Sequence, residues 1–437
     1  MNHTKLSKLW DSLRSSYWFL PTLIAGIAFV LALGLLEIDR SGNAPGWWWL
    51  YTGGPDGARS MLSTIASSMA TVAGTAFSIT IVALQLAASN FGPRLLRNFM
   101  QDMGNQIVLG TFLGTFLYCL LVLRNIRSEG FNQFVPQLSV SIGIVLAIVS
   151  VLVLIYFIHH ASTIIQASQV ITDVGKEFDR AIDRLFPERL GHQAQQHQRP
   201  VGEIPSDFET RSVLVRSQDK GYLQAIDDAE LMKIACQTDG LLWLKTQPGK
   251  YVISSSPVVS FYPKERYSPE IAKKINRVFI FGKERTEQQD IAFPIQQLVE
   301  VALRAISPAV NDPYTAIRCI DRLSAGFSQL VQRDFPSPYR YDEFYNLRVI
   351  AEPVKLESLF DCAFSPIRQY AQSDSAVTGH LLDAIALIAD HAKTSEQKRA
   401  LRHHADMILR GSQQGLSEEC DRQTIEERYQ AVLRALS

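Results

Sequence analysis

The stretch MLSTIASSMATVAGTAFSITIVALQLAAS, residues 61–89, contains no acidic, basic or histidine side chain. At a rise of 1.5 Å per residue, a helix of this length is roughly 40 Å long. Such a helix crosses the hydrocarbon core of a bilayer even when it is tilted. The stretch therefore predicts a membrane-spanning helix.

Three further apolar segments are long enough to span a bilayer. Together with the first they predict a membrane domain over residues 1–160 that holds four transmembrane helices. In the third of the four segments, Gly110 and Gly114 have the G-x-x-x-G spacing that allows two helix backbones to approach closely. The four expected spans cover about 17–36, 61–89, 107–123 and 135–158.

The first span has two interpretations, because basic residues precede it as they precede a cleaved signal peptide. Its apolar run is long for a signal peptide and continues up to the charges that begin at Glu37. We therefore expect a retained membrane anchor.

The rest of the chain reads as a soluble α+β part. An apolar stripe with steps of three and four continues past His160 and predicts an amphipathic helix, either a coiled-coil contact or a seam against the soluble domain. Short β-prone runs between Ser212 and Tyr262 follow a stretch rich in Gly, Gln and Pro. The expected order is a connecting helix over 161–185, a linker over 186–211, a small mixed β module over 212–262 and a helical bundle over 263–437.

Local signals place several helix starts in the soluble part. Ser268 before Pro269 suits an N-cap and a first turn. Capping pairs are predicted at Asp227 with Glu230, Thr286 with Gln289, and Thr394 with Gln397.

The span over 61–89 carries hydroxyl side chains at steps of three and four, which place them in one stripe. Ala70, Ala73 and Gly74 keep this helix slim, so several copies could pack around an axis with hydroxyls turned inward. The alternative is that small and hydroxylated residues only mediate helix packing. The candidate pore-lining residues are Thr64, Ser67, Ser68, Thr71, Thr75, Ser78 and Gln85.

A second candidate site is the densest polar cluster of the soluble part, within residues 304–322. It suits an ion, a small anion or a gating contact. The simpler alternative is that Ser307-Pro308 ends one helix, Asp312-Pro313 caps the next, and the arginines pair with nearby acids. The cluster consists of Arg304, Asn311, Asp312, Arg318, Asp321 and Arg322.

Composition and motifs exclude several classes of function. The 43 basic and 43 acidic residues balance, so no basic face for nucleic acid is expected. The five cysteines have no zinc or disulfide spacing, and no P-loop, nucleophile elbow, H-E-x-x-H or dinucleotide-binding turn occurs. We expect neither an enzyme nor a bound metal or cofactor.

The distribution of Lys and Arg favours both termini on the cytoplasmic side of the membrane. The loop with Trp47, Trp48, Trp49 and Tyr51 is then expected at the outer interface. The expected partners are the lipid bilayer and further copies of the chain, and the sequence identifies no soluble partner. The basic residues assigned to the inside are Lys5, Lys8, Arg14, Arg94, Arg97, Lys176, Arg180 and Arg184, against Arg40, Arg59, Arg124 and Arg127 outside.

The segment SSMATVAGTAFSITIVALQLA, residues 67–87, resembles a stretch of the bacterial predicted membrane proteins called domain of unknown function 2254. The segments Phe91–Phe99, Leu109–Cys119, Tyr156–His160 and 307–322 are also similar, so the resemblance covers essentially the whole chain. It implies a bacterial inner-membrane protein with an N-terminal membrane region and a cytoplasmic C-terminal region. It supplies no activity and no catalytic residue.

These observations favour a homo-oligomer in which the second spans line a conduit for ions or small solutes and the soluble part forms an assembly or gating ring. The alternative is a membrane-anchored sensor or scaffold, whose cytoplasmic domain binds a partner or a small ligand. The absence of ionisable side chains inside the spans argues against a proton-coupled pump.

Overall fold

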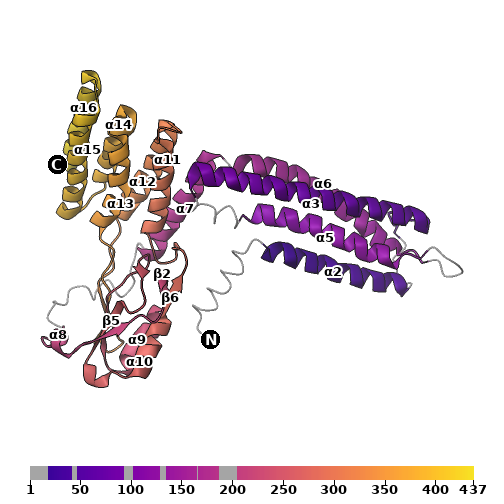
Figure 1. The fold of residues 1–437 in the computed structure, drawn as a ribbon, viewed down its shortest axis with the longest axis horizontal. Coiled ribbons are helices and arrows are strands. Elements are labelled where there is room, and N and C mark those ends of the chain that lie inside the picture. The colour runs from indigo at the N-terminus through magenta and orange to yellow at the C-terminus, as the bar shows by residue number, and fades with distance from the viewer. Residues whose placement is uncertain (1–17, 42–46, 93–101, 128–133, 165, 187–203) are drawn as a thin grey trace. The chain divides into compact units, whose positions relative to one another are not determined.

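The computed structural model describes residues 18–41, 47–92, 102–127, 134–164, 166–186 and 204–437. The chain forms two compact units, Met1–Val170 and Ile171–Ser437. Figure 1 shows a first unit of long helices and a second that combines sheets with shorter helices. Of the predicted features, residues 187–203 of the linker and the basic residues Lys5, Lys8, Arg14, Arg94 and Arg97 lie outside the described residues.

The four predicted membrane spans are confirmed as helices long and apolar enough to cross a bilayer. Two begin earlier than predicted. Pro55 supplies the fixed backbone of a first turn, and Asp102 accepts a hydrogen bond from the backbone N–H of Asn105 as an N-cap. The helices are α2 (Phe19–Arg40), α3 (Pro55–Phe91), α5 (Met103–Asn125) and α6 (Gln137–Ile164).

Polar contacts at both ends show that the spans alternate in direction. At one end, Arg40 of α2 donates to the Asn125 side chain of α5 at 2.7 Å, and Arg59 near the start of α3 donates to the carbonyl of Ile126 at 3.2 Å. At the other end, the His160 ring lies 2.7 Å from the Asp102 carboxylate. The connections after α2 and α5 therefore lie at one end, and the start of α5 and the end of α6 at the other.

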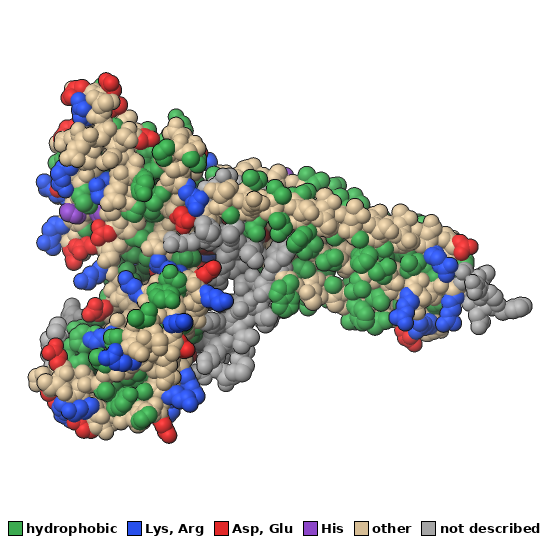
Figure 2. All heavy atoms as spheres, in the orientation of Figure 1, with side chains coloured by type: hydrophobic (Ala, Val, Ile, Leu, Met, Phe, Trp, Pro, Cys, Tyr) green, Lys and Arg blue, Asp and Glu red, His purple; other side chains and the backbone are tan. Residues whose placement is uncertain are grey.

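The centre of the membrane unit is α5, which contacts each of the other three spans. A Cβ at Gly110 would lie 3.1 Å from the Pro21 backbone and 2.7 Å from Ile24, so the predicted close approach is made between α5 and α2. Tyr118 is fully buried and donates a hydrogen bond to the carbonyl of Ser139. Figure 2 shows hydrophobic side chains along the visible outer surface of these helices, as lipid contact requires.

The second unit contains two sheets. A five-stranded sheet has the order β1-β5-β3-β8-β7, and a three-stranded sheet has the order β4-β2-β6. All pairs are antiparallel except β3 with β8. The strands are β1 (Val213–Arg216), β2 (Gly221–Ile226), β3 (Leu241–Leu244), β4 (Tyr251–Val252), β5 (Pro257–Tyr262), β6 (Phe279–Gly282), β7 (Tyr339–Tyr341) and β8 (Leu347–Ile350).

The sheets extend beyond the predicted boundary at Tyr262. Strands β6, β7 and β8 lie in the range that was expected to hold only a helical bundle, so that boundary requires correction. Each of these strands has at most four residues. β6 pairs with the distant β2 and β8 with the distant β3, while β7 pairs with the neighbouring β8. Apolar runs this short do not distinguish a strand from part of a helix.

The predicted capping pair of Thr286 with Gln289 is wrong. No helix begins there, and α11 starts at Ala292. The Gln289 side chain instead accepts a hydrogen bond from the backbone N–H of Ile226 and donates to the carbonyl of the same residue. It thereby satisfies the backbone at the end of β2. The caps at Asp227, Ser268, Asp312 and Thr394 form as predicted.

The helical core of the second unit is aromatic. Phe327 of α12 packs against Phe360 and Phe364 of α13, and Phe178 of α7 lies 5.7 Å from Phe327 between ring centroids. The apolar stripe of α7 is thus buried against the soluble unit. A 3-10 turn covers Lys264–Arg266, and the helices are α7 (Ala167–Leu185), α8 (Phe208–Arg211), α9 (Asp228–Gln237), α10 (Pro269–Val278), α11 (Ala292–Ala305), α12 (Pro313–Leu330), α13 (Leu356–Ala371), α14 (Ser375–Ala389), α15 (Ser395–Gly415) and α16 (Glu419–Leu436).

Candidate functional site

One side of α3 carries the candidate pore-lining residues, and all of them are exposed. At 100° per residue they fall within an arc of about 100°. We call this arc the hydroxyl face: Thr64, Ser67, Ser68, Thr71, Thr75, Ser78 and Gln85.

The opposite side of α3 is buried within the four-helix unit. Nearly every residue on it is small, so α5 and α6 pack closely against the helix. The hydroxyl face therefore points away from the other three spans. The buried residues are Ala58, Leu62, Ala66, Met69, Ala73, Ala76, Ala83 and Ala87.

Five hydroxyls of this face donate to carbonyls of their own helix, namely those of Thr64, Ser67, Thr71, Thr75 and Ser78. Thr71 donates to the carbonyl of Ser67 at 3.0 Å, Thr75 to that of Thr71 at 3.0 Å, and Ser78 to that of Gly74 at 2.9 Å. A hydroxyl that donates its proton keeps lone pairs for accepting hydrogen bonds or cations. These hydroxyls thus need no acceptor from outside, and their oxygens can still accept hydrogen bonds along the helix.

The face has features that the sequence analysis did not include. Ser60 lies on the same arc and is exposed, and it was missed because the predicted span began one residue later. Val82 is also exposed on this arc, between Ser78 and Gln85. The hydroxyl-rich part therefore ends at an apolar position.

The residues of the second candidate site make separate contacts rather than meeting at one point. Asp312 caps α12 through the backbone N–H of Thr315, and Asn311 before it has a left-handed φ of 51°. Arg304 lies 4.0 Å from Glu300 on its own helix, and Asp321 lies 2.6 Å from the His380 ring of α14.

The remaining two members of that cluster lie on α12. Arg322 packs along Gly175 of α7, and Arg318 is exposed. The residues of the cluster therefore contact α7, α14, and the helices α11 and α12 on which most of them lie. Capping explains Asp312 without a ligand, and ion binding by the cluster remains a prediction.

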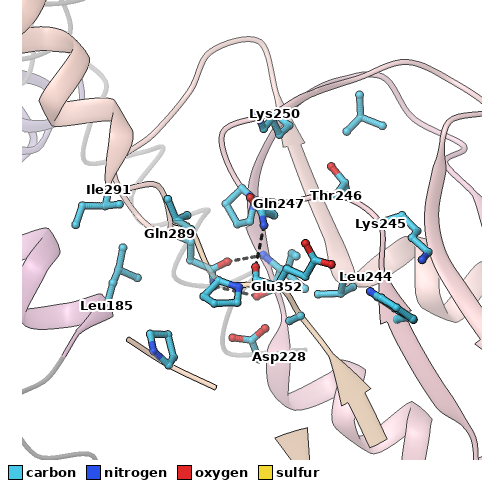
Figure 3. Close-up of a pocket in the computed structure, with 18 of the residues that line it drawn as sticks. Leu185, Asp228, Leu244, Lys245, Thr246, Gln247, Lys250, Gln289, Ile291 and Glu352 are labelled. Atoms are coloured by element: carbon cyan, nitrogen blue, oxygen red, sulfur yellow. Dashed lines mark hydrogen bonds between the residues drawn. The ribbon is translucent and has the colours of Figure 1, made fainter. Parts of the chain in front are cut away.

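A cavity of about 850 Å³ lies in the soluble unit, and Figure 3 shows many of its lining side chains. The walls come from the loops after β3 and β8, the first turn of α9 and the segment before α11. Sequence reasoning missed this cavity because its lining runs from Arg184 to Val354 and has no local motif. Within the residues that the structure describes, no group of three or more His, Cys, Asp or Glu side chains is arranged to hold a metal.

A four-helix membrane unit joined to a soluble α+β unit defines a multi-span membrane protein with a large soluble region. The chain belongs to the family described as predicted membrane protein (DUF2254), whose model matches residues 14–387. It is 31% identical over 421 residues to uncharacterized proteins of Mycobacterium bovis and Mycobacterium tuberculosis, covering 94% of this chain and 79% of theirs. No solved structure matches it.

Proposed function

We propose that the protein is a homo-oligomeric conduit for ions or small solutes, lined by the hydroxyl face of α3. The observation that carries this proposal is the position of the face, exposed on the side of α3 opposite the buried alanines. A single chain cannot enclose a lumen with a face that points away from its other spans. Several copies arranged around an axis can do so.

The helix surface suits such an assembly. A Cβ at Gly74 would meet nothing within 4 Å in the single chain, so a neighbouring helix can approach closely there. The hydroxyl oxygens, with their protons donated to the helix backbone, offer acceptors to water and to cations. We therefore infer that the conduit favours cations over anions, and that Val82 forms its apolar constriction.

The proposal includes a location and an orientation. We place the protein in the bacterial inner membrane with both termini in the cytoplasm, which makes the soluble unit a cytoplasmic ring for assembly or gating. The excess of Lys and Arg near the predicted inner ends supports this orientation. Trp48, 95% exposed between α2 and α3, then lies at the outer interface, where indole rings are favoured. The proposal assigns no catalysis to the protein.

Two measurements on purified protein test the proposal: the oligomeric state by mass photometry and cation flux into liposomes. We expect a symmetric oligomer with flux, and we expect Thr71→Leu, Thr75→Leu and Ser78→Leu to reduce flux. Thr22→Leu is the matched control, because Thr22 is an exposed hydroxyl on α2 that also bonds to its own helix, through the carbonyl of Trp18 at 2.7 Å. A silent monomer, or flux that the α3 variants leave unchanged, would refute the α3 conduit.

A second candidate function is favoured by the cavity of the soluble unit. A membrane-anchored sensor needs a site for a small ligand, and a cavity of about 850 Å³ falls within the size range of such sites. A sensor would bind ligand without carrying flux, so the liposome measurement separates it from the conduit.

A further inference from the structure

The soluble cavity has the construction of a preformed binding site. Its loops are tied together, since the Gln247 side chain donates to the carbonyl of Glu352 at 2.8 Å, a contact between two loops that Figure 3 shows. On another wall, the amide of Gln289 is fixed by its two hydrogen bonds to Ile226. Side chains and loops held in this way lose little entropy when a ligand binds.

Aromatic rings supply the apolar part of the lining. Trp243, Tyr251 and Phe186 all contribute to it. The ammonium group of Lys245 lies 3.9 Å from the centroid of the Trp243 ring, and Tyr251 packs edge-on against Tyr222 with a centroid distance of 5.1 Å. Lys245 covers the Trp243 ring, whereas the Tyr251 ring is 58% exposed and provides a flat surface against which a planar group can stack.

The charge of the lining is positive. Four basic residues, Arg184, Lys245, Lys250 and Arg340, face two acidic ones, Asp228 and Glu352. The difference of two positive charges favours an anion. Glu352 and both lysines are exposed to solvent, so their charges remain accessible to a ligand.

Arg340 is the most constrained of these cations. It is half-buried, and its guanidinium donates to the backbone carbonyls of Ser337 and Tyr339. Over the described ranges, neither Arg340 nor Asp228 has an ion-pair partner within 4.0 Å. Burial lowers the pKa of Arg340 and raises that of Asp228, although each charge partly offsets this effect on the other. An anionic ligand group near Arg340 would add to the partial compensation that Asp228 provides.

We propose that this cavity binds a phosphorylated small molecule with a planar ring, of the size and chemical class of a nucleotide. The basic side chains take the phosphate, and the aromatic wall takes the ring. The inference deepens the sensor alternative, and because it rests only on contacts inside the soluble unit, it is independent of the conduit.

The test is binding to the full-length protein in detergent, measured by calorimetry and by the shift in unfolding temperature. The probes are AMP, ADP and ATP, with adenosine and inorganic phosphate as partial ligands. We expect at least one nucleotide to bind more tightly than either partial ligand. Lys250→Gln and Arg340→Gln should each weaken that binding about tenfold or more, as expected for the loss of a charge-assisted hydrogen bond.

Lys273→Gln is the matched control, since Lys273 is exposed on α10 and does not line the cavity. It should bind the nucleotide as the unaltered protein does. The proposal is overturned if no nucleotide binds, if adenosine binds as tightly as AMP, or if the control weakens binding as much as Lys250→Gln. Should Arg340→Gln fail to fold, Lys250→Gln and Lys245→Gln still test the proposal, because each removes a basic side chain of the cavity and should weaken nucleotide binding. Flux is not measured, so the outcome does not depend on whether α3 lines a conduit.

Discussion

The carboxylate of Asp39 near the end of α2 holds Ser139 at the start of α6, accepting its hydroxyl at 2.6 Å and its backbone N–H at 2.9 Å. It also accepts the backbone N–H of Leu138. One side chain thus satisfies N–H groups that α6 leaves free in its first turn, and its negative charge lies at the positive end of the helix dipole.

Replacing Asp39 by Ala should therefore destabilise the membrane unit by about 1–3 kcal/mol, because partly buried donors lose their acceptor. The measurement is thermal unfolding in detergent. The stability of Asp39→Asn should lie between that of the unaltered protein and that of Asp39→Ala, since asparagine keeps one acceptor oxygen. Glu37→Ala is the control, because Glu37 only pairs with Arg40 at 3.6 Å on an exposed surface. Equal effects at both positions would mean that the cap contributes nothing specific.

Gly74→Leu should separate assembly from folding. The added side chain meets nothing in the single chain and improves helix propensity by roughly 0.8–1 kcal/mol, so the fold should be retained. If copies pack through the side of α3 that carries Gly74, next to the hydroxyl face, the oligomer should dissociate. Gly34→Leu on α2 is the matched control, because a Cβ there also meets nothing within 4 Å. Mass photometry measures both, and an intact oligomer with Gly74→Leu would exclude the Gly74 side of α3 from the contact.

Asp312 and Asn311 test the capping account of the polar cluster. Asp312→Ala should cost about 1 kcal/mol of stability, and Asp312→Ser much less, because serine also accepts from the backbone. Asn311 has a left-handed backbone, so Asn311→Gly should be nearly neutral and Asn311→Ala should cost roughly 1 kcal/mol. Thermal unfolding checks all four variants. A loss of flux or ligand binding at unchanged stability would instead support an ion-binding role.

His404 should make the soluble unit sensitive to acid. It is 2% exposed between Phe360 and Phe364, and burial lowers its pKa to about 4. The ordinary value of about 6.5 applies in the unfolded chain. Below that pH the unfolded chain takes up a proton that the folded chain does not. Stability is therefore lost as the pH falls from about 6.5 to about 4, by on the order of 3 kcal/mol.

The corresponding measurement is the pH dependence of unfolding rather than stability at one pH. His404→Gln should flatten the loss between pH 6.5 and 4, whatever its effect at neutral pH. His403→Gln is the neighbouring control, since His403 is exposed. Identical pH profiles for the two variants would show that His404 is not the group responsible.

The contacts that could be predicted from the sequence were those between residues close together along the chain. The caps at Ser268 and Thr394 were predictable because the residue that each one satisfies lies three positions along the chain. Gln289 was misassigned because its partner Ile226 is 63 residues away. The same reason hid β6, which pairs with β2, and the pairing of β8 with β3, because these partners are remote in sequence.

The candidate sites also divide into features set by local sequence and features set by long-range packing. The hydroxyl face was predicted because helical periodicity alone gathers Thr64, Thr71 and Thr75 on one arc. The sequence did not show that this arc points away from the other spans, because its direction follows from how α3 packs on α5 and α6. The cavity could not be predicted, since residues such as Asp228 and Arg340 meet only after the sheets have formed.

The parallel pairing of Leu242 with Val349 has a consequence for synthesis of the chain. A ribosome adds roughly 5–20 residues per second, so β3 waits about 5–20 s before β8 has been made. During that interval the membrane spans are already complete, while one edge of the sheet has no neighbour. An edge of this kind is open to other chains. Nascent chains translated from one messenger RNA insert close together in the membrane. Their β3 edges can therefore mispair until residue 350 has been made.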